Sequence, residues 1–144
     1  MFTFEFSISV NRQQQEVFDF VSNPANDAQW QSSNISNELT SEGSVGVGST
    51  MRSVDKLLGR KVESTTEVTV WDPPNQYAFK SIGGPFPFEI TMTLESKEEG
   101  TQLTASGQAE FGGFFKLAEG LVGKQLEKQF TNDFDALKMM LEAG

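Results

Sequence analysis

The residue types that carry most enzymatic and metal chemistry are missing from this sequence. Its 144 residues include no histidine and no cysteine. The chain therefore has no thiolate nucleophile, no imidazole base, no disulfide, and no thiolate or imidazole ligand for a metal. We expect no metal and no cofactor. Any catalysis would have to use carboxylates, hydroxyl groups, lysines or Tyr77, the single tyrosine.

Carboxylates are the main remaining candidates for acid–base chemistry. Alternation along the predicted strands places five of them on the solvent-facing side: Glu63, Glu67, Glu89, Glu95 and Glu110. Arg52 and Asp55 lie on a strand whose two faces the pattern does not distinguish. Burial would make either residue a functional-site candidate through desolvation, and the alternative is that both project into solvent at a strand end.

The charge balance argues against two classes of partner. The chain has 20 Asp and Glu residues against 11 Lys and Arg residues, a formal net charge of −9. This charge repels phosphate backbones and anionic lipid headgroups, so we expect no nucleic-acid binding. No stretch approaches the roughly 20 apolar residues of a membrane span. Residues 1–10 read as a strand and not as a signal peptide. We expect a cytoplasmic protein, monomeric or weakly dimeric, without a stable membrane anchor, and we interpret the acidic excess as a solubility feature.

The elements that would position functional residues follow from the spacing of apolar side chains. Period-two alternation predicts a strand over residues 2–10 and six more strands from residue 35 to about residue 111, separated by turns rich in glycine and proline. Two short helices between them are predicted to end near Trp30. Such alternation indicates an antiparallel sheet with one covered face and one solvent-facing side. Trp71 falls on the outer side by this alternation.

A stripe of apolar residues predicts a long C-terminal helix across the covered face. Its members are Val122, Leu126, Phe130, Phe134, Leu137 and Leu141. A second apolar set lies about 150° around the same helix, with two glycines at the change of phase, so we expect a kink or break at these glycines. One hypothesis is a mobile lid over a cavity, and the alternative is a short helix packed on the glycine-rich loops. The possible lid residues are Phe114, Leu117, Gly120, Leu121 and Gly123.

Small residues on the covered face raise the question of an internal cavity. Ala105, Gly107 and Ala109 present little volume beneath the predicted helix, and large residues opposite would refill that space in an ordinary core. The two alternatives are an apolar cavity with a few orienting hydroxyl groups and a solid phenylalanine-rich core. A cavity below about 300 Å³ would argue against the small-molecule hypotheses and favour a protein-interaction module. The predicted cavity residues are Ser64, Thr66, Val68, Tyr77, Phe79, Ser81, Phe88, Ile90, Met92, Ala105, Gly107, Ala109, Phe130 and Phe134.

A glycine cluster at Gly43, Gly46 and Gly48 does not predict a nucleotide-binding loop. A dinucleotide motif would need a third glycine where Met51 stands and a helix after it, whereas strand signals follow. We expect a tight hairpin or bulge, with backbone that approaches the cavity rim.

Several short segments, taken in order, resemble a known family. They are Val17-Phe18-Asp19-Phe20-Val21 leading to Pro24 and Trp30, Val45-Gly46-Val47-Gly48-Ser49, Val70-Trp71-Asp72-Pro73-Pro74, Gly83-Gly84-Pro85-Phe86, Gly100-Thr101 and the long final helix. Together they are similar to the START/Bet v 1-like (SRPBCC) superfamily, in particular its polyketide cyclase/dehydrase-like branch. The resemblance covers residues 1–144 as a single domain. It implies an α+β helix-grip fold, in which a seven-stranded curved antiparallel sheet wraps around a long C-terminal helix and encloses a hydrophobic cavity, with two short helices after the first strand.

The resemblance implies a ligand class but no particular reaction. The leading hypothesis is binding or transport of a hydrophobic small molecule, such as a lipid, an isoprenoid or a polyketide-like compound. A second is a cyclase or dehydratase that uses the same cavity without metal, histidine or cysteine, in which Tyr77, a serine or a carboxylate moves protons. The lack of histidine weighs against catalysis. A third is a protein-interaction module without a ligand.

Overall fold

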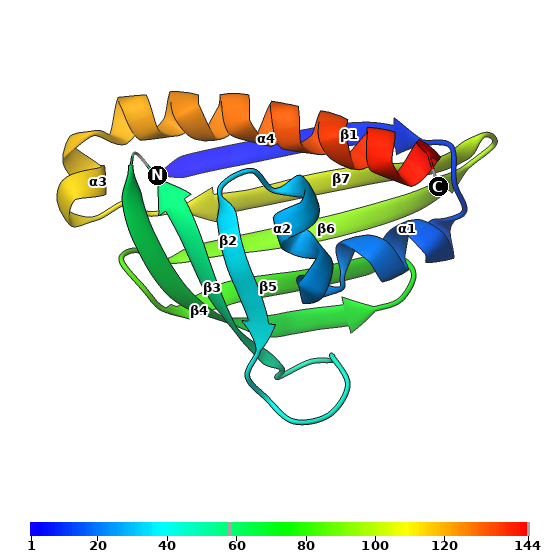
Figure 1. The fold of residues 1–144 in the computed structure, drawn as a ribbon, viewed down its shortest axis with the longest axis horizontal. Coiled ribbons are helices and arrows are strands. Elements are labelled where there is room, and N and C mark those ends of the chain that lie inside the picture. The colour runs from blue at the N-terminus through cyan, green and yellow to red at the C-terminus, as the bar shows by residue number, and fades with distance from the viewer. Residues whose placement is uncertain (58, 144) are drawn as a thin grey trace.

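The order of elements in the computed structural model, which describes residues 1–57 and 59–143 apart from the side chain of Phe114, follows the predicted order (Figure 1). The described residues form seven strands and five helical segments, with three helical segments after the first strand and two after the last. They are β1 (Phe2–Val10), α1 (Gln14–Val21), the short 3-10 helix η1 (Pro24–Asn26), α2 (Asp27–Trp30), β2 (Asn34–Leu39), β3 (Thr50–Leu57), β4 (Arg60–Asp72), β5 (Gln76–Gly83), β6 (Phe88–Lys97), β7 (Gly100–Ala109), α3 (Gly113–Leu117) and α4 (Glu119–Ala143).

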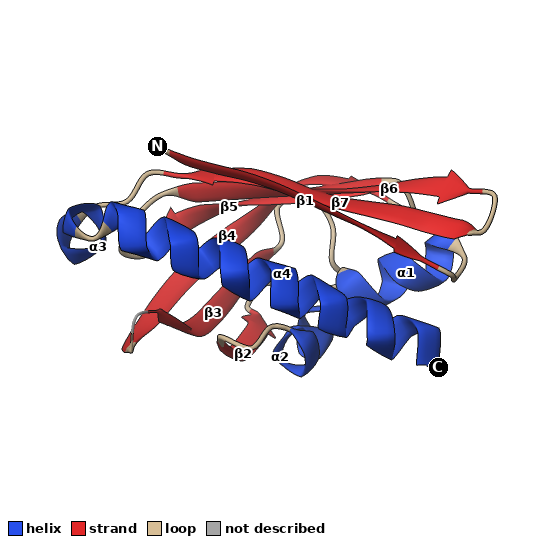
Figure 2. Ribbon diagram, turned by 90° about the horizontal axis from the view of Figure 1, so that it is seen from above, coloured by secondary structure: helices blue, strands red, loops and turns tan. Residues whose placement is uncertain are grey.

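All seven strands form one antiparallel sheet in the order β1-β7-β6-β5-β4-β3-β2. Strands β1 and β2 are therefore opposite edges, and α1, η1 and α2 carry the chain from one edge to the other across one side of the sheet. Helix α4 lies on that same side, and β2 and β3 bend toward it (Figure 2). The prediction of a helix-grip fold is confirmed.

Two apolar clusters fix α4 against the sheet. The first lies beside α1 and includes Phe18, Leu103 and Leu137, each at most 1% exposed. The second lies at the start of α4 and includes Phe111, Phe115 and Val122. Burial of apolar area at about 25 cal/mol per Å² makes such clusters the main source of stability.

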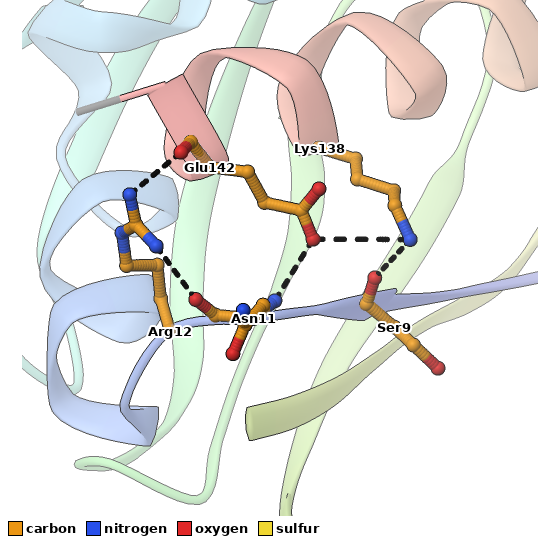
Figure 3. Close-up of polar contacts among 5 residues, drawn as sticks. All are labelled: Ser9, Asn11, Arg12, Lys138 and Glu142. Atoms are coloured by element: carbon orange, nitrogen blue, oxygen red, sulfur yellow. Dashed lines mark hydrogen bonds and ion pairs between the residues drawn. The ribbon is translucent and has the colours of Figure 1, made fainter. Parts of the chain in front are cut away.

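Polar contacts tie the end of α4 to the connection between β1 and α1 (Figure 3). The Arg12 guanidinium donates to the Glu142 backbone carbonyl at 2.6 Å, and the Asn11 backbone N–H donates to the Glu142 carboxylate at 2.9 Å. The Lys138 ammonium donates to the Ser9 carbonyl at 2.6 Å. These contacts satisfy a backbone carbonyl in the last turn of α4, where no helical partner is available.

The break before α4 lies at a different position from the predicted one. We predicted it at Gly120 and Gly123, but both are within α4, and the chain turns at Ala118. Position 123 of this helix favours glycine, because a Cβ there would lie only 3.3 Å from the Phe2 ring. The absence of a side chain thus allows α4 to approach β1 closely.

A β-bulge reverses the predicted orientation of Trp71. The register between β4 and β5 shifts between Val68 and Val70, which inserts one extra residue into β4. Because side chains alternate along a strand, a one-residue insertion moves every following side chain to the other face. Trp71 therefore points inward, with its ring centroid 5.2 Å from that of Phe18 and 6.1 Å from that of Tyr77.

Candidate functional site

A cavity of about 250 Å³ lies between the covered face of the sheet and α4. All but two of the predicted cavity residues line it. They are Ser64, Thr66, Val68, Tyr77, Phe79, Phe88, Ile90, Met92, Ala105, Ala109, Phe130 and Phe134. Most are apolar, and they come from β4, β5, β6, β7 and α4, so the alternating strands build an apolar floor beneath the helix. That they bind a ligand stays a prediction.

Ser81 and Gly107 are outside the residues that line the cavity. The Ser81 hydroxyl accepts a hydrogen bond from the Phe88 backbone N–H at 2.9 Å, across the β5–β6 connection. At Gly107, a Cβ would lie 2.8 Å from the Phe4 ring and 2.4 Å from the Glu89 carbonyl oxygen. The Phe4 ring therefore fills the space that the small residue leaves.

The Tyr77 hydroxyl, which the sequence analysis offered as a group that moves protons, is hydrogen-bonded to the backbone. It donates to the Val21 carbonyl at 2.8 Å, and the residue is 7% exposed. Burial raises the pKa of Tyr77, and the charge of Asp27 raises it further. Only the tyrosine ring contributes to the cavity, while its polar atom joins β5 to the end of α1.

Four of the predicted lid residues, Leu117, Gly120, Leu121 and Gly123, are not among the residues that line the cavity. Leu117 is 92% exposed and Leu121 is 62% exposed, and Phe114 lies outside the described side chains. The neighbouring Phe115 packs instead against Phe86, with ring centroids 5.5 Å apart. Helix α3 is thus a short helix that packs against the Gly83–Phe86 segment. A lid motion stays a prediction.

The glycine cluster forms the connection between β2 and β3. Gly43 and Gly48 have φ angles of 84° and 90°, a left-handed conformation that glycine adopts without strain. A turn at this point was expected. The predicted approach of this backbone to the cavity is wrong, because the cavity lining takes no residue from positions 40–49.

The side of the cavity beside α2, β2 and β3 is polar, which the sequence did not lead us to expect. We call it the polar wall and define it as Asp27, Trp30, Asn34, Asn37, Ser53, Asp55 and Asp133. Asp27 and Trp30 come from α2, Asn34 and Asn37 from β2, Ser53 and Asp55 from β3, and Asp133 from α4. These elements meet because the connection from β1 to β2 carries the chain across the sheet from one edge to the other.

Hydrogen bonds connect the members of the polar wall in two groups. The Asn37 amide donates to the Asp27 carboxylate, and the Ser53 hydroxyl donates to Asn37 Oδ1 at 2.9 Å. The Asn34 amide donates to Asp55 Oδ1 at 3.1 Å. A backbone N–H from Ser32 donates to Asp133 Oδ1 at 3.1 Å. The polar wall is therefore an ordered arrangement of side chains from four elements.

Two polar atoms of the wall have no partner. The Trp30 indole N–H and Asn34 Oδ1 are buried and form no hydrogen bond with the described residues. Buried polar groups are nearly always hydrogen-bonded, and an unpaired group costs about 1–3 kcal/mol. One unpaired donor and one unpaired acceptor thus belong to residues that line the cavity.

Burial perturbs all three carboxylates of the wall. It raises the pKa of Asp27 to about 7, an effect that the Asn37 hydrogen bond opposes and the charge of Asp55 reinforces. Burial also raises the pKa of Asp55 against the hydrogen bond from Asn34, and that of Asp133 against the hydrogen bond from Ser32. Within the part of the chain that the structure describes, none of these aspartates forms an ion pair.

The structure places Asp55 at the cavity and Arg52 at the surface. Asp55 lines the cavity, whereas Arg52 is exposed and pairs with Glu63 at 2.6 Å. Of the other glutamates predicted to face solvent, Glu89, Glu95 and Glu110 are exposed and Glu67 is half-buried. The interpretation of the acidic excess as a solubility feature does not extend to the three aspartates of the polar wall, of which Asp55 was already a candidate.

Two of the missed residues carried a signal in the sequence. Asp133 lies three residues after Phe130 and four before Leu137, so helical spacing places it beside the apolar stripe. Asp27 lies three residues before Trp30, which puts the two on one side of a helix. Asn34 and Asn37 carry no such signal, because their strand has no clear alternation.

The comparison with protein families matches the chain over residues 1–142. The matching family is described as polyketide cyclase / dehydrase and lipid transport. The chain belongs to this family. The description of this family names both enzymes and lipid transport.

Solved structures share the same fold at low sequence identity. A Thermus thermophilus protein aligns with a TM-score of 0.84 and 21% identity over 98% of this chain and 97% of its own. A START superfamily protein from Mycobacterium smegmatis aligns with a TM-score of 0.80 and 17% identity over 99% of both chains. Ara h 8.0201 aligns with a TM-score of 0.72 and 16% identity over 99% of this chain and 98% of its own. No curated protein sequence matches.

Two further observations concern metal-binding clusters and membrane-spanning helices. Among the described residues, no group of three carboxylates is arranged to hold a metal ion. No described helix combines the length and the apolar character that crossing a membrane requires.

Proposed function

We propose that this protein binds a small amphipathic molecule, apolar at one end and polar at the other, in the cavity between the sheet and α4. The observation that carries the proposal is the division of the cavity into an apolar floor and a polar wall with an unpaired donor and acceptor. Ligand sites in proteins are typically apolar with a few placed polar groups. A core selected for stability alone would pair or exclude those polar atoms.

The volume of the cavity limits the size of the ligand. At about 250 Å³ it is slightly below the lower end, about 300 Å³, of typical ligand sites. By the limit stated from the sequence, the volume alone argues against a small-molecule site and favours an interaction module, so the proposal rests on the polar wall. A ligand that fits is small, or leaves part of its length outside.

Native mass spectrometry of the purified protein, followed by extraction and identification of any retained molecule, tests this proposal. A panel of small amphiphiles should also raise the unfolding temperature, because a ligand at 100 times its Kd adds about 2.7 kcal/mol to stability. If no molecule is retained and no compound shifts the transition, the proposal fails and an interaction module becomes the better hypothesis.

A pair of variants tests whether binding occurs in this cavity. Ala105→Leu places extra volume on the cavity floor, where Ala105 is 2% exposed, and should abolish the ligand-induced shift. Ala28→Leu adds the same atoms at an exposed position on α2 and should leave the shift unchanged. Equal shifts in both variants would place the ligand elsewhere.

Acid–base catalysis in the same cavity is a second candidate function. A general acid or base works best with a pKa near the operating pH, and the pKa of Asp27 is about 7. Incubation of an extracted ligand with the protein, analysed by mass spectrometry for loss of water or a changed mass, tests this candidate. Asp27→Asn should stop such a conversion while the ligand still binds, whereas an unchanged rate would exclude Asp27 from catalysis.

A further inference from the structure

The charge of the polar wall is the feature that distinguishes one class of amphiphile from another. Asp27, Asp55 and Asp133 approach the cavity from three elements, α2, β3 and α4. Lys56 is the only cation among the described residues that line the cavity, and it is exposed. The polar end of the cavity is therefore acidic, so it favours a positive group and repels a carboxylate.

Two residues that line this end of the cavity carry hydrogen-bonding groups that the described residues leave unpaired. Trp30 is 6% exposed and lines the cavity, and its indole N–H has no acceptor among the described residues. Asn34 donates its amide hydrogens to Asp55 Oδ1 and to the Ser36 carbonyl at 3.3 Å, and its own Oδ1 has no donor there. A protonated amine has N–H donors and no acceptor, so it can donate hydrogen bonds to Asn34 Oδ1 and to the carboxylates, and it leaves the Trp30 N–H unpaired.

An organic cation fits this arrangement better than a metal ion does. The three aspartates belong to different hydrogen-bonded groups and, within the described residues, do not form a metal-binding cluster. An ammonium group on an apolar body can contact the wall while its hydrocarbon part covers the floor. The aromatic rings of Trp30 and Phe134, 5.4 Å apart, add faces that attract a cation.

We propose that the ligand is a small amine, whose protonated nitrogen lies against Asp27, Asp55 and Asp133 and whose apolar part lies on the sheet floor. This inference rests on the proposed function, because it names the ligand class of the same cavity. It excludes fatty acids and other carboxylates as preferred ligands.

Three probes of matched chain length test the inference by isothermal titration calorimetry at pH 7.5. They are octylamine, 1-octanol and octanoate, which carry a positive, a neutral and a negative end. We expect octylamine to bind at least about tenfold more tightly than octanoate, with 1-octanol between them. Octanoate that binds as tightly as octylamine overturns the inference but leaves the proposed function standing. If none of the three binds, the proposed function fails as well.

Variants then show whether the carboxylates of the wall provide the preference. Asp55→Asn and Asp133→Asn should each weaken octylamine at least about fivefold, and neither should weaken 1-octanol. Asp135→Asn removes the same charge from an exposed position on α4 and serves as the matched control. An equal effect of Asp135→Asn would show that the net charge of the protein, and not the wall, selects the amine. Circular dichroism of each variant confirms that it is folded.

Discussion

Replacing Asp27 with asparagine should make the stability of this protein less dependent on pH. Burial raises the pKa of Asp27 from 3.8 to about 7 in the folded protein. An asparagine at position 27 has nearly the same shape, and its amide oxygen can still accept the hydrogen bond from Asn37. It cannot ionise, so the substitution removes the titration while keeping the contact.

The direction of the effect follows from the raised pKa. Below the unfolded pKa, Asp27 is protonated in both states and costs nothing. As the pH rises toward about 7, the unfolded chain loses this proton while the folded protein keeps it, so the free energy of unfolding falls. Each pKa unit corresponds to 1.36 kcal/mol, so the total loss across this window is about 4 kcal/mol.

Urea unfolding of the two proteins, followed by circular dichroism at several pH values from about 3.5 to 8, measures this difference. The stability of Asp27→Asn relative to the parent protein should rise by about 4 kcal/mol across the window. Asp55 and Asp133 also have raised pKa values, but they are present in both proteins and largely cancel in the comparison. A difference that stays constant within about 1 kcal/mol would refute the reasoning.

Two packing predictions and one hydrogen-bond prediction can be checked by urea unfolding at pH 7. Gly107→Ala should cost about 1–3 kcal/mol by overpacking against a ring and a carbonyl, while Gly46→Ala, with nothing within 4 Å, should be close to neutral. Leu137→Ala should cost about 2–5 kcal/mol because Leu137 is fully buried, and Met139→Ala, at a position 73% exposed, should cost less than about 0.5 kcal/mol. Tyr77→Phe should cost about 1–3 kcal/mol because a buried carbonyl loses its donor. Equal costs within a matched pair would contradict the assigned packing.

The sequence predicted the sheet and the long helix well because both depend on local periodicity. Residues of β1 alternate without interruption, and the apolar stripe of α4 repeats with helical spacing from Val122 to Leu141. The prediction was wrong at Trp71, because the bulge near Val70 depends on pairing with β5 and leaves no mark in the alternation. The helix break at Ala118 likewise depends on tertiary packing.

The apolar floor was predictable for the same reason, and the polar wall was not. Floor residues lie on long strands whose phase is clear. The wall combines Asp27 from a four-residue helix with side chains from β2 and β3, where the apolar pattern is weak. Only the topology, which brings α2 beside β2 and α4, shows that these polar residues share a cavity.

The acidic wall also links ligand binding to protonation. Three carboxylates lie at the cavity without a described cationic partner, and burial keeps Asp27 largely protonated below pH 7. A bound ammonium favours the ionised carboxylate, so the proposed amine should displace a proton from Asp27 when it binds near pH 6. Binding should release about one proton per amine, because a carboxyl group with a pKa near 7 is about nine-tenths protonated at pH 6.

Calorimetry in buffers of different ionisation enthalpy measures this proton directly. At pH 6, octylamine binding should release close to one proton from the parent protein and much less from Asp27→Asn. 1-Octanol carries no charge and should release almost none from either protein. Proton uptake with octylamine, or equal release from both proteins, would show that Asp27 does not face the amine. The same residue that lowers stability at neutral pH would then have no part in recognition, and its burial would need another explanation.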